Sequence, residues 1–99
     1  MAKRVLLATR DLVFRSKLGA IVTAAGGEAT RDATCDLAVL DVEAPGVEAR
    51  IRELVTRGVP VLAYGSHVRA DLLHAAREAG ATAVPNSQVE ERLREFLIP

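Results

Sequence analysis

The chain has 99 residues, of which 49% are hydrophobic and 26% are charged. It is therefore long enough to bury one core, and it lacks the low hydrophobicity and high net charge that are typical of disorder. Its 13 basic and 13 acidic residues cancel, which removes a bulk electrostatic attraction to nucleic acid or to an anionic membrane. Cys35 is the only cysteine, which excludes an internal disulfide and a zinc site made of several cysteines.

No stretch approaches the roughly 20 apolar residues that a membrane span requires. The apolar run near the N-terminus is also too short for a signal peptide. We therefore expect a cytoplasmic protein in which residues 1–99 form one domain.

The first half of the chain predicts a strand, a helix and two further strands. Residues 4–9 form a short apolar run, and apolar residues then recur every three or four positions from 11 to 25, which is typical of a helix. A glycine pair ends that helix. Residues 28–30 predict a short edge strand because charged residues flank them, and residues 36–42 predict a buried strand.

The second half alternates between helices and strands. Helical spacing over residues 47–57, 68–79 and 89–97 predicts three helices, and apolar runs at 59–64 and 81–84 predict two strands. The middle helix of these is expected to place Leu72, Ala75, Ala76 and Ala79 inward. Because the longest apolar runs do not alternate, their strands are expected to be buried on both faces. The chain therefore predicts an α/β fold, a three-layer sandwich around a mostly parallel five-stranded sheet.

One segment carries the clearest motif. In "DLAVLDVEAPG", residues 36–46, Asp41 ends an apolar run and a Pro-Gly turn follows. "VPVLAYGSH" and "AREAGATAV" come later in the chain, at residues 59–67 and 76–84. Together, over nearly the whole chain, these motifs resemble the receiver domain of bacterial response regulators. The resemblance implies a flavodoxin-like strand order, 2-1-3-4-5, and a role in signal transduction.

The resemblance also implies an unusual connection. Only "RDATC", residues 31–35, joins the second and third predicted strands, so the helix that receivers have there is missing. Parallel neighbours normally need a crossover of a dozen residues or more. In the order 2-1-3-4-5, a short passage over or beneath the first strand is required. An antiparallel or displaced second strand is the alternative.

In the receiver family, Asp41 matches the aspartate that accepts a phosphoryl group. Two acidic residues after the first strand hold Mg²⁺ there, but the matching positions in this chain are Thr9 and Arg10, and Asp11 comes one place late. Magnesium prefers hard oxygen ligands, so these replacements remove most of its attraction to the site.

Two further partners of the phosphoryl group are absent. The family's hydroxyl residue after the fourth strand is matched by Gly65, with Ser66 adjacent, and no lysine follows the fifth strand, where Asn86 and Ser87 lie. A phosphorylated aspartate would therefore have few compensating charges. The resemblance is thus to a degenerate receiver, with Asp41 as a phosphoacceptor-like position and no catalysis, metal or cofactor.

The residues near Asp41 also have structural interpretations. Asp41 is expected to be satisfied by a bidentate pair with Arg10, by backbone N–H groups or by water. Asp11 is expected to cap the first helix, with a displaced metal ligand as the alternative. Ser66 is a candidate cap of the next helix, and His67 is a candidate for titration near the pocket but is more often a solvated loop residue.

We therefore predict a stand-alone pseudo-receiver that acts through protein–protein contacts and without phosphorylation. Its protein partner is not encoded in any recognisable motif, and the resemblance implies a homodimer through the last two helices and the fifth strand. Two alternatives stay open. One is a Mg²⁺-dependent receiver that is phosphorylated on Asp41, and the other is a small-ligand-binding flavodoxin-like module that uses residues 65–67.

Overall fold

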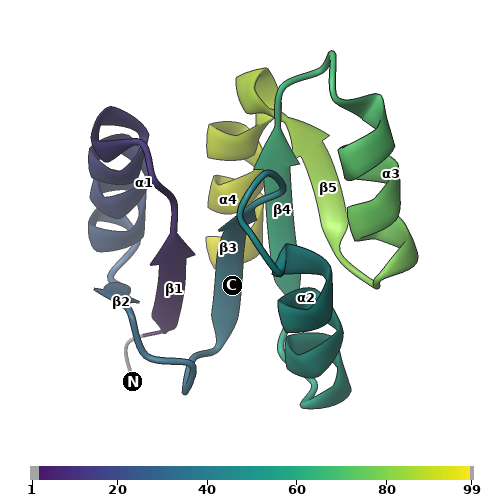
Figure 1. The fold of residues 1–99 in the computed structure, drawn as a ribbon. Helices are drawn as coiled ribbons and strands as arrows, with labels where there is room; N and C mark the ends of the chain where they lie inside the picture. Colours follow the sequence, from purple (N-terminus) through teal and green to yellow (C-terminus); the bar gives the residue numbers. More distant parts are fainter. Residues whose placement is uncertain (1–2, 99) are drawn as a thin grey trace.

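A sheet of five strands forms the centre of the structure, and helices cover both of its faces (Figure 1). The computed structural model describes residues 3–98. In chain order the elements are β1 (Arg4–Ala8), α1 (Leu12–Ala24), β2 (Glu28–Thr30), β3 (Leu37–Asp41), α2 (Val47–Thr56), β4 (Val61–Gly65), α3 (Ala70–Glu78), β5 (Thr82–Pro85), a short 3₁₀ helix η1 (Asn86–Gln88) and α4 (Val89–Leu97).

The strand order is β2-β1-β3-β4-β5, and every neighbouring pair is parallel. The predicted order is therefore confirmed, and the antiparallel alternative for the second strand is wrong. Because all strands run the same way, their carboxyl ends meet at one edge of the sheet. In this register Asp41 lies beside Tyr64, and Gly65 lies beside Pro85.

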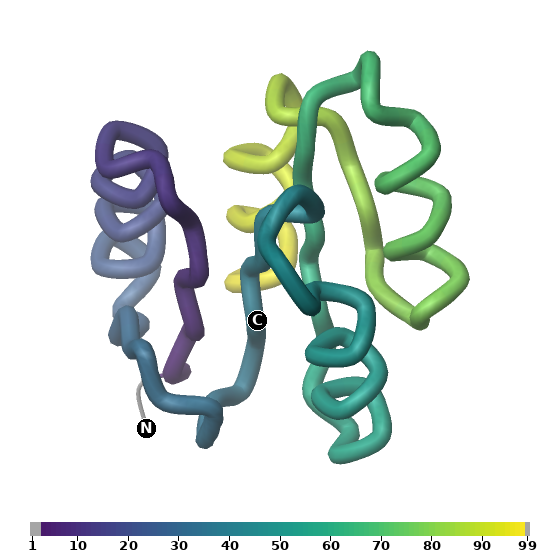
Figure 2. The backbone as a smooth tube through the Cα atoms, in the orientation of Figure 1, coloured from purple at the N-terminus to yellow at the C-terminus, as the bar shows by residue number. Residues whose placement is uncertain are grey.

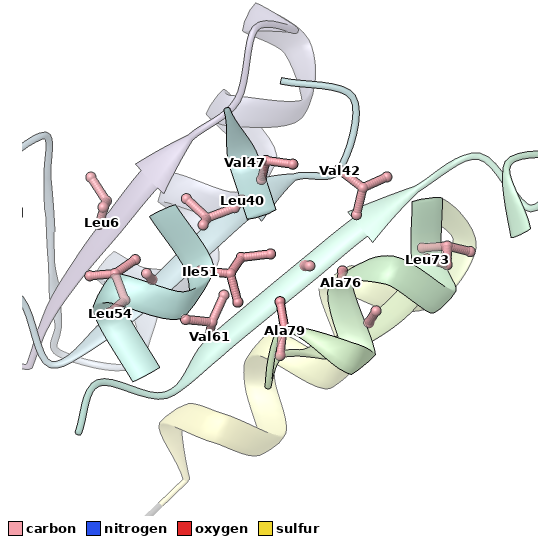
Figure 3. Close-up of a cluster of buried hydrophobic side chains, with 14 residues drawn as sticks. Leu6, Leu40, Val42, Val47, Ile51, Leu54, Val61, Leu73, Ala76 and Ala79 are labelled. Carbon is pink, nitrogen blue, oxygen red and sulfur yellow. The ribbon is translucent and has the colours of Figure 1, made fainter. Parts of the chain in front are cut away.

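Two separate clusters of buried side chains hold the three layers together. One cluster packs α2 and α3 against the sheet (Figure 3), and it includes Leu6, Leu40, Ile51 and Ala76. The other packs α1 and α4 against the opposite face. Successive strand residues point to opposite faces, so Leu6 belongs to the first cluster and Leu7 to the second. This explains why β3 and β4 are apolar at nearly every position.

The passage from β2 to β3 contains no helix, and Figure 2 shows the chain running directly between the two strands. The register makes this passage feasible: Thr30 pairs with Leu6 on one side of β1, and Leu37 pairs with Val5 on the other. The six residues 31–36 must span two strand spacings, roughly 10 Å, whereas an extended chain of that length reaches about 20 Å.

Hydrogen bonds anchor this passage in its middle and at the end that leads into β3. The Arg57 guanidinium, just beyond α2, donates to the Ala33 carbonyl oxygen at 2.9 Å, and the Asp36 carboxylate accepts from the Arg4 backbone N–H at 2.8 Å. Arg4 of β1 and Thr30 of β2 lie on the part of the sheet beside this passage. Their side chains are hydrogen-bonded to each other. The missing helix therefore leaves a largely polar strip on this part of the sheet.

Three of the four predicted α-helices begin within one residue of their expected position, and α3 is the exception. It begins at Ala70 rather than Val68, and Val68 is 72% exposed in the preceding loop. Of the four residues expected to point inward, Ala76 and Ala79 are buried, and Leu72 and Ala75 are half-buried. Leu73, which was not expected to point inward, is buried. Within residues 3–98, no helix has the length and apolar character to cross a membrane.

Candidate functional site

The carboxyl edge of the sheet brings together most of the predicted site. Asp41 ends β3, Thr9–Asp11 follow β1, and Gly65 ends β4. The carboxyl edge of a parallel sheet is where open α/β folds place their ligands. The candidate site is therefore the surface around Asp41.

The Asp41 carboxylate is held mainly by its own loop. Its Oδ1 atom accepts a hydrogen bond from the Glu43 backbone N–H at 2.9 Å. Its Oδ2 atom lies 3.9 Å from Nη2 of Arg10, whose side chain is 64% exposed. The expected pairing with Arg10 exists, but its expected bidentate geometry is wrong, because a single long contact replaces two parallel hydrogen bonds. Asp41 is thus satisfied by a backbone donor and one loosely held cation.

Asp11 turns its carboxylate to the start of α1. Its Oδ1 atom accepts from the N–H groups of Val13 and Phe14 at 2.9 and 3.1 Å, which confirms the predicted helix cap. The Thr9 hydroxyl oxygen in turn accepts from the Asp11 N–H at 3.4 Å. Within the described part of the chain, no three His, Cys, Asp or Glu side chains gather in a group that could hold a metal ion.

Gly65 is the residue that the resemblance matches to the hydroxyl position of receivers, and the space beside it is filled. A Cβ atom built on Gly65 would clash with Cγ2 of Val42, the residue that follows Asp41. Val42 itself is buried in the α2–α3 cluster, and its N–H donates to the Tyr64 carbonyl oxygen. A side chain at position 65 would therefore require Val42 to move.

Tyr64 is a part of the site that sequence reasoning missed. Its side chain is buried, its ring packs edge-to-face on Phe14 with centroids 4.9 Å apart, and its hydroxyl has no hydrogen-bond partner among the described residues. Burial raises the pKa of Tyr64 to about 12; the Thr9 side chain nearby opposes this rise, and the Asp41 carboxylate adds to it. Although Thr9 is close enough to influence the phenol, the two groups do not adopt hydrogen-bond geometry. The sequence feature that could have pointed to this residue is that it is the only tyrosine of the chain and stands in an otherwise apolar strand.

Arg69 forms a second feature that the sequence did not reveal. Its guanidinium lies 3.4 Å from the Glu43 carboxylate, and it donates two hydrogen bonds to Asp71, at 3.3 and 3.4 Å. These bonds lower the pKa of Asp71. Arg69 thus ties the loop after β3 to the start of α3, at the same edge of the sheet as Asp41.

The remaining predicted neighbours do not join Asp41. The Ser66 hydroxyl accepts from the Val68 N–H at 3.4 Å in a loop turn, so it does not cap α3 as expected. His67 and Ser87 are exposed, and Ser87 lies in η1. Across residues 3–98, no hydrogen bond or ion pair links these three side chains to Asp41.

A shallow groove near the site runs between the first turn of α2 and the start of α3. It has a volume of about 440 Å³. Its walls include Val42, Glu43, Gly46, Arg69 and Leu72. Residues 65–67 do not line it.

The surface made by α3, β5 and α4 is polar, and many of its charges are already paired. His74 lies 3.6 Å from Glu78 on α3, and Arg92 lies 3.6 Å from Glu95 on α4. The Arg77 guanidinium donates to the Ala83 carbonyl oxygen of β5 at 2.8 Å. His74 is on the surface. These pairs describe a solvated face with local ion pairs.

The sequence matches no protein-family model and no curated protein. Its three-dimensional structure, in contrast, is similar to several solved structures. A putative response regulator from Chloroflexus aurantiacus is 21% identical, with a TM-score of 0.76, and the match covers 98% of both chains. The BeF3-activated DrrB receiver domain is 18% identical, with a TM-score of 0.77 and 98% of both chains covered.

NtrX from Brucella abortus is 20% identical, with a TM-score of 0.76, over 97% of this chain. The match covers only 26% of NtrX, so this chain spans about a quarter of that protein. At these identities the likeness concerns the arrangement of strands and helices and not the residues of the site. The chain has the flavodoxin-like fold of response-regulator receiver domains.

Proposed function

We propose that this chain is a receiver-like module that acts in signalling or regulation through protein–protein contacts, without phosphorylation of Asp41. The observation that carries the proposal is the Gly65–Val42 contact. The position that provides a phosphoryl-binding hydroxyl in receivers has no side chain here, and Val42 fills the space that one would occupy.

The charges around Asp41 support the same proposal. A phosphorylated aspartate would add negative charge beside a carboxylate loop that already contains Glu43. In receivers a metal ion and a lysine offset that charge, whereas in this site Arg10 is the residue that forms an ion pair with Asp41. Because Arg10 is mostly exposed, water screens its attraction, and it compensates little.

On this proposal Asp41 has a structural role. Its carboxylate closes the turn after β3 through the Glu43 N–H, and this turn leads through Pro45 and Gly46 into α2. We further propose that residues 1–99 form one receiver-like domain, that it works in the cytoplasm, and that it has no enzymatic activity. The exposed charged face of α3, β5 and α4 is available to a protein partner.

Treatment with acetyl phosphate and Mg²⁺, followed by intact-mass measurement, tests the proposal. We expect the mass to stay that of the unmodified chain, while a receiver domain that this reagent phosphorylates, treated in parallel, gains one phosphoryl group. The Asp41→Asn variant is the matched control. A stoichiometric phosphoryl adduct on the wild-type chain that is absent from Asp41→Asn would overturn the proposal.

A further inference from the structure

The outer side of α1 is unusual for a helix that lies on the surface. Arg15 and Lys17 are its only charged residues, whereas α2, α3 and α4 each carry several charges of both signs. Leu12 and Val13, in its first turn, are 80% and 67% exposed. Ser16, Lys17 and Thr23 are exposed as well, so the outer side of α1 is poor in charge but not wholly apolar. A surface with so few charged residues has the character of an interface.

An apolar groove lies along the later turns of α1, where this helix packs against α4, and so away from Leu12 and Val13. Its volume is about 730 Å³. The small and apolar residues that line it are Ala20, Ile21, Ala24, Ala25, Leu97 and Ile98. Ile98 is 68% exposed, so the groove is open to solvent at that point. Because Ala24 ends α1 shortly before β2 begins, the groove lies toward the opposite end of the sheet from Asp41.

The charges on the rim of the groove suit a second copy of the same chain. Lys17 lies on the α1 side, and Glu90 and Arg94 lie on the α4 side. In a two-fold symmetric contact the same patch meets itself, so Lys17 of each copy can face Glu90 of the other. The exposed side of α1 offers no acidic residue that would repel Glu90. The alanines at positions 20 and 24 would also allow the two α1 helices to approach closely.

We propose that two copies of this chain associate through α1 and the α1–α4 groove. Each copy would insert the exposed side of α1 against the groove of the other, with Lys17–Glu90 pairs at the two rims. This interface differs from the α3–β5–α4 dimer that the resemblance implies. We favour the α1 interface because several charges of the α3–β5–α4 surface are paired within each copy. A stable interface needs roughly 800 Å² from each partner. That is about a seventh of the 5647 Å² that the chain exposes. The proposal does not depend on whether Asp41 is phosphorylated.

Sedimentation equilibrium from micromolar to sub-millimolar concentration tests this proposal. We expect the wild-type chain to reach twice the monomer mass. Lys17→Glu and Glu90→Lys should each weaken the dimer about tenfold by opposing like charges across the rim. The double variant Lys17→Glu/Glu90→Lys should recover an affinity close to that of the wild type.

Two more variants locate the contact. Ala20→Glu, which places a charge in the groove, should give a monomer, and its thermal unfolding by circular dichroism checks that it stays folded. Glu78→Lys, on the exposed side of α3, is the matched control and should leave the dimer unchanged. A wild-type chain that stays monomeric at every concentration would overturn the proposal. So would a dimer that Glu78→Lys disrupts and Ala20→Glu does not.

Discussion

Asp41 keeps its place at the end of β3, and its neighbours decide what it can do there. The hydrogen bond from the Glu43 N–H contributes about 1 kcal/mol to stability, as intramolecular hydrogen bonds of this kind do. The contact with Arg10 is long and exposed, so its contribution lies at the low end of the range of about 0–1 kcal/mol for surface pairs. The turn after β3 therefore stabilises the Asp41 carboxylate at least as much as Arg10 does.

The Gly65–Val42 contact gives a prediction about stability. Gly65→Ala should lower the free energy of unfolding by about 1–3 kcal/mol, because the new methyl group overlaps the Val42 side chain. In a Val42→Ala background the same change should cost much less. Urea unfolding of the four proteins in this double-mutant cycle measures the coupling.

Gly19→Ala is the matched control, because a Cβ atom at Gly19 meets only Leu7 at an ordinary distance of 3.9 Å. Gly19→Ala should raise the free energy of unfolding by up to about 1 kcal/mol, because alanine is more favourable than glycine inside a helix. If Gly65→Ala were as stable as the wild type, Val42 would not obstruct that position, and the main support for the proposed function would be lost.

Tyr64 gives a prediction about pH. Its phenol has a pKa of about 12 in the folded chain and an ordinary value of 10.0 when unfolded, so the folded state favours the neutral form. The stability contributed by neutral Tyr64 is complete below pH 10.0 and is lost as the pH rises to about 12. The total loss is roughly 2–3 kcal/mol. Tyr64→Phe should lack this loss and, without a buried unpaired hydroxyl, should be at least as stable as the wild type near neutral pH.

Because Tyr64 is the only tyrosine and the chain has no tryptophan, absorbance of the tyrosinate reports this side chain alone. Urea unfolding of the wild type and of Tyr64→Phe across this pH range measures the difference in their free energies of unfolding. The contributions of other titrating side chains cancel in this difference, because both proteins contain them. Ionisation of the folded chain at the ordinary pKa would show that the phenol is not buried as described.

For single residues, roles that depend on neighbours in the sequence could be predicted. Roles that depend on contacts between distant segments could not. The capping role of Asp11 follows from its position just before a helical repeat, and the structure confirms it. The clash between Val42 and a side chain at position 65 depends on how closely two neighbouring strands approach, which no sequence pattern records. The same holds for the burial of the Tyr64 hydroxyl, because it depends on the packing of Phe14 from α1.

At the scale of elements, the helices with regular apolar repeats were predicted closely. The end of α1 follows from its glycine pair, and α4 has the predicted bounds. The start of α3 was misplaced because Val68 continues the apolar repeat by chance, whereas the Ser66 turn and the Arg69 contacts hold residues 66–69 in a loop. Local polar contacts of this kind compete with helix formation, so apolar spacing alone does not locate the start of the helix.

The passage from β2 to β3 could not be decided from the sequence alone. Its length allows either a crossing over β1 or a displaced strand, and only the pairing of Thr30 with Leu6 and of Leu37 with Val5 distinguishes them. Register is set by long-range packing on the two faces of β1. The polar outer residues of β1 and β2 are consistent with a sheet region that no helix covers, a pattern that could be recognised once the strand order was known.

At the scale of the whole molecule, the fold and the chemistry of the site are separable. The two buried clusters and the parallel register reproduce the receiver architecture, and they involve none of the groups that would bind metal or phosphate. This is why apolar spacing predicted most strands and helices and the resemblance predicted their order, while the behaviour of Asp41 had to be argued from its neighbours. A fold of this kind can present partner surfaces on its helices whatever happens at the sheet edge.

The most direct test of this account is a titration with Mg²⁺ and beryllofluoride, a mimic of the aspartyl phosphoryl group, followed by amide signals in nuclear magnetic resonance spectra. We expect the signals of Glu43, Gly65 and Ser66 to show no saturable shift beyond that of a matched salt control. Saturable shifts at these residues that disappear in Asp41→Asn would contradict it, because they would show that the site around Asp41 still binds metal and a phosphoryl group.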